Sequence, residues 1–508
     1  MVNTVYTVAV WGIDGFEVSV ECNFENGLPE ISVIGLPDTS VKEATDRIRA
    51  VTKNNSLPFV RGKATINLAP ADKKKVGSYY DLAILVSMLK HNVLENINTD
   101  DSTFIGELSL AGELRPVSGA LPMCITARDA GKKKVYLPYE NAVEASMVTD
   151  VEVYGVKNIN QLIAHLKGRE EIIPTRFSVG SSVVKRAPQL DFADIKGQGK
   201  AKRSIEIAVA GGHNILLVGP PGSGKSMLSK AMVGILPDMT YEEMVESTKV
   251  HSITGCLSAD DPIVCARPFR APHHTVSHVG VVGGGTQPQP GEVSLAHNGI
   301  LFLDEFTEFN KKTLEALRQP IEDGVITVAR ANYKLTFPSR FMLVAAMNPC
   351  PCGYYGSNQK QCTCGSATVR RYLDKISGPL LDRIDVHIEV PAVSFDDMES
   401  DEDCEPSAVV RTRINRAREY TKRRLQRLGL DNDPIHAFKK ENCNFTPDSN
   451  SLLKNSFESM NMSARSHDRI VKLSRTIADL AGSETVESEH VLEAVQMRSI
   501  DKKYFEKQ

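Results

Sequence analysis

The chain has 508 residues, of which 41% are hydrophobic and 24% are charged, and its formal net charge is −3. This length exceeds what one hydrophobic core usually supports, so we expect several folded domains. The near-neutral charge gives no overall sign of nucleic-acid binding, and any such surface must be local. We find no apolar run of membrane-spanning length and no signal peptide, and we expect a cytoplasmic protein without membrane contact.

The N-terminal third alternates two kinds of segment, which is typical of an α/β domain. Strand-like runs fall at residues 5–11, 16–22, 64–68 and 134–137, and amphipathic helical runs at 41–52 and 81–89. We assign this domain to residues 1–168. Residues 169–189 carry charges, prolines and a Ser/Val/Gly tract without helical periodicity, which predicts a linker.

A second α/β domain is expected at residues 190–395. Its three apolar strands are Ile215–Val218, Ile300–Leu303 and residues 342–346, separated by helical segments. This alternation predicts a parallel, doubly wound nucleotide-binding sheet. Residues 396–508 begin with an acidic connection up to position 405 and continue with helical periodicity, so we expect an all-α lid.

A glycine-rich segment joins the first of these strands to a helix, and it fits the phosphate-binding pattern G-x-x-x-x-G-K-[ST]. It consists of Gly219, Pro220, Pro221, Gly222, Ser223, Gly224, Lys225 and Ser226. Its backbone N–H groups and the following helix N-terminus suit phosphate oxygens. Lys225 is expected to reach the β and γ phosphates of ATP, and the Ser226 hydroxyl to ligate Mg²⁺. The alternative is a glycine-rich turn that matches the pattern by chance.

Two further strand ends carry polar residues suited to the same site. Asp304 and Glu305 follow a buried-type strand, where Asp304 would hold Mg²⁺ and Glu305 would polarise the attacking water. Asn348 follows the third strand and is a candidate to bind the γ-phosphate or that water. The alternatives are a strand that merely ends at solvent, and an Asn that caps a turn before proline.

An arginine stands between a short helix and the next strand, in Gly-Pro-Leu-Leu-Asp-Arg-Ile-Asp at residues 378–385. Placed there, Arg383 can neutralise charge on the γ-phosphate in the transition state. Its alternative role is an ion pair with Asp382 or Asp385. Spacing alone does not decide between the two.

Four cysteines form two C-x-C pairs at Cys350, Cys352, Cys362 and Cys364. Four thiolates satisfy a tetrahedral Zn²⁺ site, so we predict a structural zinc knuckle at residues 350–364 with no open coordination position. The alternatives are free thiols or two disulfides.

Basic residues are dense in a predicted helix near the start of the lid: Arg411, Arg413, Arg416, Arg418, Lys422, Arg423, Arg424 and Arg427. Such a face can follow a phosphate backbone. It can equally pair with the acidic residues 396–405, and the sequence does not separate these interpretations.

Together these residues resemble the AAA+ ATPases, and more closely the magnesium-chelatase-like ComM/YifB family. The most specific segments are residues 267–277 (RPFRAPHHTVS), 283–285, 290–292 and 295–299, with further matching blocks at 66–72 and 473–481. The resemblance implies a helix-2 insert around residues 280–289 and a pre-sensor hairpin at 323–338.

The resemblance also implies roles for the site residues. Asp304 and Glu305 would form the Walker B pair, and Asn348 would be the first sensor. Arg383 would be a finger donated to a neighbouring subunit of a hexameric ring. Arg465 would be the second sensor, with Arg469, one turn on, as the competing candidate.

The N-terminal domain resembles the Lon protease catalytic fold at residues 75–81 and 106–112. In this comparison Tyr79 takes the position of the nucleophilic serine and Leu121 that of the lysine base. Ser78 and residues 73–75 are near neighbours, but the departure from the pattern leads us to expect no peptidase activity.

The resemblance implies an ATP-driven ring motor on DNA, a helicase or branch-migration translocase. Such a motor would promote integration of single-stranded DNA in homologous recombination or natural transformation, with recombination proteins as further partners. The alternative is an AAA+ remodelling or metal-chelatase-type chaperone that acts on a protein partner. The N-terminal domain and the cysteine pairs favour the motor.

Overall fold

The structure, a computed structural model, describes residues 2–58, 62–178, 190–285, 288–330, 333–357, 360–393, 395, 404–430, 438–460, 462–498 and 500–505. The chain divides into two compact units. Unit 1 comprises Met1–Val184 and Thr240–Cys265, and unit 2 comprises Lys185–Met239 and Ala266–Gln508. Within the described part of the chain, no helix combines the length and apolar character that crossing a bilayer requires.

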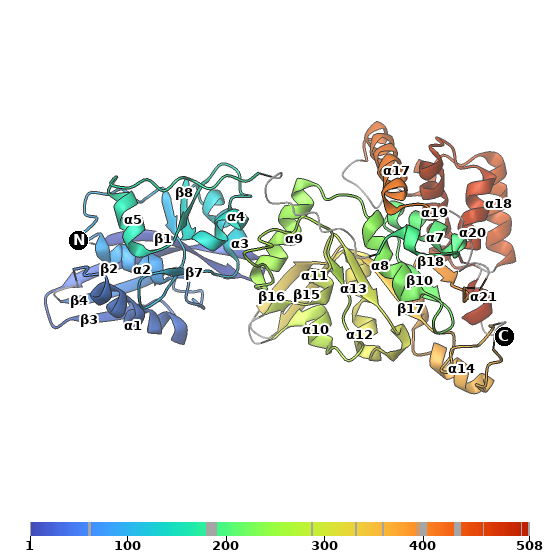
Figure 1. Cartoon of the computed structure of the whole chain (residues 1–508), viewed down its shortest axis with the longest axis horizontal. Helices are drawn as coiled ribbons and strands as arrows, with labels where there is room; N and C mark the ends of the chain where they lie inside the picture. The colour runs from blue at the N-terminus through green and yellow to red at the C-terminus, as the bar shows by residue number, and fades with distance from the viewer. Residues whose placement is uncertain are drawn as a thin grey trace. The chain divides into compact units, whose positions relative to one another are not determined.

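Unit 1 is built on a seven-stranded mixed sheet with the order β3-β4-β2-β1-β5-β8-β9 (Figure 1). Its strands are β1 (Asn3–Trp11), β2 (Asp14–Glu25), β3 (Glu30–Ile34), β4 (Lys63–Ala69), β5 (Ser102–Phe104), β8 (Lys134–Pro138) and β9 (Glu152–Val156). Strand β4 alternates half-buried and buried residues along its length, as expected of a sheet with one face on the core. The short strands β6 (Glu107–Leu108) and β7 (Leu114–Arg115) form a separate pair.

The helices of unit 1 differ in how deeply they are buried. They are α1 (Thr39–Asn54), α2 (Asp81–Leu89), α3 (Ala120–Asp129), α4 (Ala142–Ala145), α5 (Ile159–Leu166) and α9 (Tyr241–Ile253). Every residue of α2 is buried, which matches its apolar sequence on all sides. Helix α1 buries one stripe that includes Val41, Ile48 and Val51, as its amphipathic pattern predicts.

Helix α9 belongs to unit 1 although it follows the phosphate-loop helix in the chain. A capping box closes its N-terminus, where the Thr240 hydroxyl accepts from the Glu243 N–H and the Glu243 carboxylate accepts from the Thr240 N–H. The helix packs against α3, and its Ser252 hydroxyl donates to the buried carboxylate of Glu144. Residues 240–265, which the sequence analysis assigned to the second domain, therefore contribute to the fold of the first.

Unit 2 contains a five-stranded, all-parallel sheet with the order β11-β14-β17-β10-β18. Its strands are β10 (Ile215–Val218), β11 (Phe269–Arg270), β14 (Ile300–Leu303), β17 (Met342–Met347) and β18 (Val386–Glu389). Every residue of β10, β14 and β17 is buried. The mixed α/β architecture and the parallel sheet predicted from the sequence are confirmed.

The helices before the lid in unit 2 are α7 (Gly199–Gly211), α8 (Lys225–Ile235), α10 (His278–Val282), α11 (Glu292–Leu295), α12 (Lys311–Ala316), α13 (Arg318–Asp323), α14 (Ser366–Leu373) and α15 (Gly378–Leu381). Two small antiparallel pairs accompany them. One joins β12 (Gly283–Gly284) to β13 (Gln289–Pro290), and the other, the 325–338 hairpin, joins β15 (Val325–Arg330) to β16 (Tyr333–Pro338). Residues 331–332, between these two strands, lie outside the described residues.

The C-terminal region is helical, as predicted, with α17 (Ser407–Leu428), α18 (Pro447–Ser459), α19 (Ala464–Ala481), α20 (Ser488–Gln496) and α21 (Ile500–Tyr504) (Figure 1). Buried residues of α17, α19 and α20 join those of α7, α8 and the parallel sheet in one hydrophobic core. The lid and the sheet are therefore one folding unit. The expected acidic connection lies largely outside the described residues.

A buried aspartate ties this helical region to the sheet. Asp385, at the start of β18, is 1% exposed and accepts a hydrogen bond from the backbone N–H of Asn214 at 3.2 Å. Its carboxylate also faces Arg469 and Lys472 of α19 and the buried His213. Burial alone would raise the pKa of Asp385, but Lys472, His213 and Arg469 outweigh it and hold the pKa well below its usual range.

We expect Asp385→Asn to destabilise unit 2 by about 3 kcal/mol near neutral pH, because cations around a buried site lose their counter-charge. Since the folded-state pKa is depressed, ionised Asp385 stabilises the fold above the unfolded carboxyl pKa of about 3.9. That contribution is lost as the pH falls toward the folded-state value. Urea unfolding between pH 6 and pH 3 should show the wild-type advantage shrinking as the pH falls.

The matched control is Asp382→Asn, at a partly buried position in the same segment. It should shift the urea midpoint little at any pH. A wild-type advantage over Asp385→Asn that is independent of pH would contradict an electrostatic role for Asp385.

Candidate nucleotide-binding site

The Lys225 side chain lies at the carboxyl edge of the parallel sheet, at the start of α8. It is 8% exposed, and its ammonium donates to the backbone carbonyls of Gly219 and Pro220, both at 2.8 Å. Longer contacts of 3.3 Å reach the Ser223 hydroxyl and the amide oxygen of Asn348. Burial lowers the pKa of Lys225 to about 8, and the charge of Asp304 offsets part of this effect. A buried ammonium held only by neutral oxygens is suited to an anionic ligand.

Ser226 and Asp304 meet beside this lysine. The Ser226 hydroxyl donates to Oδ2 of Asp304 at 2.7 Å, which brings the end of β14 to the first turn of α8. A hydroxyl and a carboxylate at this distance are oxygen ligands of the kind that Mg²⁺ prefers. The structure thus brings together Lys225, Ser226, Asp304 and Asn348, from three segments that are far apart in the sequence.

Glu305 has a strained backbone and a partner that the sequence analysis did not identify. Its φ of 49° lies in the left-handed region, which is uncommon for a residue other than glycine and frequent at functional sites. Its carboxylate is 3.0 Å from Nδ1 of His274, whose ring lies at a tilt to that of His273, with 4.1 Å between the ring centroids. His274 follows β11, so a neighbouring strand end supplies the contact. Because β11 and β14 end at the same edge of the sheet, the position of His274 shortly after a strand could have marked it as a candidate partner of Glu305.

Close backbone approach explains the first glycine of the loop. A Cβ on Gly219 would lie 2.2 Å from the carbonyl oxygen of Val390, so only glycine lets the loop cross the end of β18. Gln198 supports the same region, because its amide donates to the Pro391 carbonyl at 2.6 Å. Gln198 was also not predicted from the sequence.

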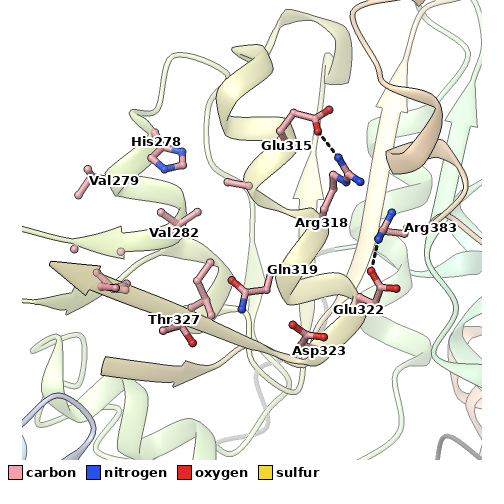
Figure 2. A pocket seen from close by; sticks show the side chains of 16 residues that line it. His278, Val279, Val282, Glu315, Arg318, Gln319, Glu322, Asp323, Thr327 and Arg383 are labelled. Atoms are coloured by element: carbon pink, nitrogen blue, oxygen red, sulfur yellow. Dashed lines mark hydrogen bonds and ion pairs between the residues drawn. The ribbon is translucent and has the colours of Figure 1, made fainter. Parts of the chain in front are cut away.

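Arg383 lies at a different place from Lys225, beside a pocket of about 690 Å³. Figure 2 shows its guanidinium directed at Glu322 of α13. Nε donates to Glu322 Oε2 at 3.0 Å, a second nitrogen contacts the same oxygen, and a third donates to the Pro379 carbonyl at 2.7 Å. The ion pair considered for Arg383 thus involves neither Asp382 nor Asp385 but a residue 61 positions away.

The two candidates for the second sensor differ in their contacts. Arg469 is paired with buried Asp385. Arg465 is exposed and makes no hydrogen bond or ion pair with the described residues, although its charge lowers the pKa of Glu322. An exposed arginine is the better placed of the two to contact a ligand, so Arg465 remains our candidate.

The four cysteines of residues 350–364 converge on one point. Their Sγ atoms all lie within 4.8 Å of one another, and three of the separations are 3.3, 3.5 and 3.6 Å. A tetrahedral zinc site with Zn–S bonds of ~2.3 Å has edges of ~3.8 Å, so this donor set fits such an ion. None of the four is in a disulfide. Backbone N–H groups of Tyr354 and Thr363 lower the pKa of Cys352 to about 5, which favours its thiolate, whereas the neighbouring Cys350 and Cys352 raise the pKa values of Cys362 and Cys364.

The cysteine cluster is packed against the phosphate loop. Gly353, with a φ of 85°, lies so near Pro221 that a Cβ would be 2.4 Å from its ring. The cluster also follows directly on Asn348, which contacts Lys225. The conformation of the cysteine cluster therefore affects the positions of the phosphate loop and Asn348.

In unit 1 the positions compared with a peptidase have other partners. Ser78 donates to the Glu107 carboxylate, and buried Lys75 donates to the Pro70 carbonyl. Tyr79 accepts a hydrogen bond from the Val10 N–H at 3.4 Å, and Leu121 is fully buried. The absence of peptidase activity stays a prediction.

Several basic residues of helix α17 form ion pairs within unit 2. Arg413 pairs with Glu206 and Glu405, and Arg427 pairs with Glu484. Buried Arg424 faces Asp479. Glu405, the one acidic residue of the run 396–405 that the structure describes, is the partner of Arg413.

The parallel sheet, the loop that surrounds Lys225 and the acidic end of β14 define the class of this protein as an AAA+ ATPase of the magnesium-chelatase type. Three family models cover most of the chain: "Magnesium chelatase, subunit ChlI" matches residues 191–398, "Subunit ChlI of Mg-chelatase" residues 20–141, and "Magnesium chelatase, subunit ChlI C-terminal" residues 404–498.

The chain belongs to the ComM/YifB family. It is 39% identical to the uncharacterized protein YifB of Escherichia coli over 98% of this chain and 97% of that protein. Identity to the competence protein ComM of Haemophilus influenzae is also 39%, over 98% of this chain and 97% of the relative. A shorter match, 26% identical, relates 37% of the chain to 18% of the DNA replication licensing factor mcm6 of Dictyostelium discoideum.

Proposed function

We propose that this protein is an ATP-hydrolysing ring motor that acts on DNA. The observation that carries the ATPase activity is the buried Lys225 ammonium beside the Ser226–Asp304 pair. A triphosphate would accept hydrogen bonds from Lys225 and supply the counter-charge that Asp304 provides only in part, and Mg²⁺ would be held by Ser226 and Asp304. Glu305 would polarise the attacking water, and Asn348 would contact the γ-phosphate or that water.

The site is completed by a second subunit in this proposal. Arg383 lies with Glu322 and makes no contact with the phosphate loop among the described residues. An arginine that acts on a neighbour's nucleotide requires head-to-tail contacts, and head-to-tail contacts that close give a ring. We propose a hexamer, with Arg383 as the finger and Arg465 as the second sensor.

The DNA substrate is proposed from the relatives. The full-length relative ComM is named a competence protein, and the partial relative mcm6 a DNA replication licensing factor. We propose helicase or branch-migration activity that promotes integration of single-stranded DNA during recombination or transformation. A chelatase-type chaperone for a protein partner is the second candidate, because the matching family models are named after a chelatase subunit.

ATP hydrolysis should rise severalfold with forked or three-stranded DNA, and the purified protein should move a branch point. Since phosphate contacts release counterions, the stimulation should fall as salt increases. A coupled ATPase assay and a gel-based branch-migration assay measure both. Lys225→Ala should lower both activities by on the order of a hundredfold, as loss of a charge-stabilising group does.

ATP hydrolysis that Lys225→Ala abolishes but DNA never stimulates would contradict the DNA motor and favour the chaperone. An unchanged rate of hydrolysis in Lys225→Ala would contradict the nucleotide site itself.

We also propose that Cys350, Cys352, Cys362 and Cys364 hold a structural Zn²⁺. Elemental analysis should find about one zinc per chain, since four thiolates fill a tetrahedral site. The double variant Cys352→Ser/Cys362→Ser should lose the zinc and bind ATP more weakly, because Gly353 packs on Pro221.

The matched control for the zinc site is Cys256→Ser, an exposed cysteine of unit 1, which should keep its zinc. Zinc-free protein in which all four thiols titrate as free would contradict the site.

A further inference from the structure

Arg383 is held inward by its own chain. Its side chain is 8% exposed, whereas that of Glu322 is 54% exposed. Three of its five N–H donors are engaged, two on one carboxylate oxygen and one on a carbonyl. Held in this way, the guanidinium has its charge neutralised and little surface to present to a ligand.

Glu322 is in contact with Arg383, and the charges of two further arginines favour its ionised form. Hydrogen bonds from Arg383 lower the pKa of Glu322, and the charges of Arg383, Arg465 and Arg469 lower it further against the effect of burial. The pocket at Arg383 also contains Glu315, Arg318 and Asp323. Arg318 is already paired with Glu315 at 2.9 Å (Figure 2). An incoming phosphate would therefore compete with Glu322 for Arg383.

Glu322 is also attached to the 325–338 hairpin. It lies in the last turn of α13, and only Asp323 and Gly324 separate it from β15. Gly324 has a φ of 66° and its carbonyl accepts from the Ser339 N–H at 2.9 Å, which closes the base of the hairpin. A Cβ on Gly324 would lie 2.9 Å from the Arg340 side chain. A shift of the hairpin base is thus transmitted to Glu322 through two residues in close packing.

We propose that Glu322 is a latch for Arg383: it holds the guanidinium until displacement of the 325–338 hairpin releases it to a neighbour's nucleotide. The latch rests on the proposed function, in which Arg383 is a finger and the motor acts on DNA, and it adds that bound DNA displaces the hairpin. It makes Glu322 a positioning residue that restrains hydrolysis when no DNA is bound.

The strength of the contact suits a switch. Ion pairs with a partly exposed partner are individually weak, so a modest shift of the hairpin is enough to break this one. A finger arginine at the γ-phosphate changes turnover by ~10³–10⁵. Once Glu322 has withdrawn, Arg383 is available to stabilise the transition state.

The test compares ATPase rates of the full chain with and without forked DNA in four proteins: wild type, Glu322→Gln, Arg383→Ala and the double variant. Glu322→Gln keeps the shape and removes the charge. We expect its DNA-free rate to rise about two- to fivefold, the factor that a partly exposed ion pair represents. The DNA stimulation should shrink by the same factor, and the double variant should be as slow as Arg383→Ala.

Glu315→Gln is the matched control, because Glu315 lines the same pocket but pairs with Arg318. It should leave both rates unchanged. Thermal unfolding and size-exclusion chromatography check that each variant folds and assembles. If Glu322→Gln does not, Glu322→Asp, which keeps the charge on a shorter side chain, should raise the DNA-free rate by a smaller factor.

Equal loss of the DNA-free and DNA-stimulated rates in Glu322→Gln would overturn the latch, since Glu322 would then support the finger. Unchanged rates would overturn it as well. An unaffected Arg383→Ala would overturn the finger assignment and the latch together. If DNA does not stimulate the wild type, the proposed DNA function fails, and a DNA-free rise that requires Arg383 still supports the latch.

Discussion

The buried ammonium of Lys225 is the constraint on which the rest of the candidate site depends. A cation with 8% exposure that is hydrogen-bonded to neutral oxygens, with only part of its desolvation offset by the charge of Asp304, is costly unless an anion can approach. The parallel sheet meets this need because all its strands end at one edge. That edge brings Asp304 from β14 and Asn348 from β17 to the loop that follows β10.

Two glycines at close contacts fix the conformation of the loop at this edge. Glycine at position 219 allows the loop to cross the end of β18, and glycine at position 353 allows the cysteine cluster to pack against Pro221. Asp385 then ties the opposite end of β18 to α19, so that the lid and the sheet share one core. The nucleotide site is therefore supported by contacts that span most of unit 2.

The strands, the phosphate loop and the cysteine cluster could be predicted because each is marked by residues that lie close together in the sequence. Apolar runs of four to six residues marked β10, β14 and β17. The glycine pattern marked the phosphate loop, and two C-x-C pairs marked a cluster whose Sγ atoms do converge. In each of these the informative residues lie close together in the chain, so spacing alone carries the information.

The parts that could not be predicted depend on long-range packing. Nothing in the sequence of α9 shows that it docks on α3 in unit 1. The pairing of Arg383 with Glu322 joins residues 61 positions apart, and that of Glu305 with His274 depends on which strands are neighbours. The density of basic residues in α17 likewise did not show that Arg413 and Arg427 form ion pairs with Glu206 and Glu484 of the same unit.

In the proposed motor the active site is shared between subunits, and mixing two inactive variants tests this sharing. Arg383→Ala subunits keep Glu305, and Glu305→Gln subunits keep Arg383, so only mixed rings contain complete sites. At equal amounts about a quarter of the interfaces combine both intact residues, so we expect up to about a quarter of wild-type ATPase activity. No recovery at any mixing ratio, in rings shown to have exchanged subunits, would contradict the account.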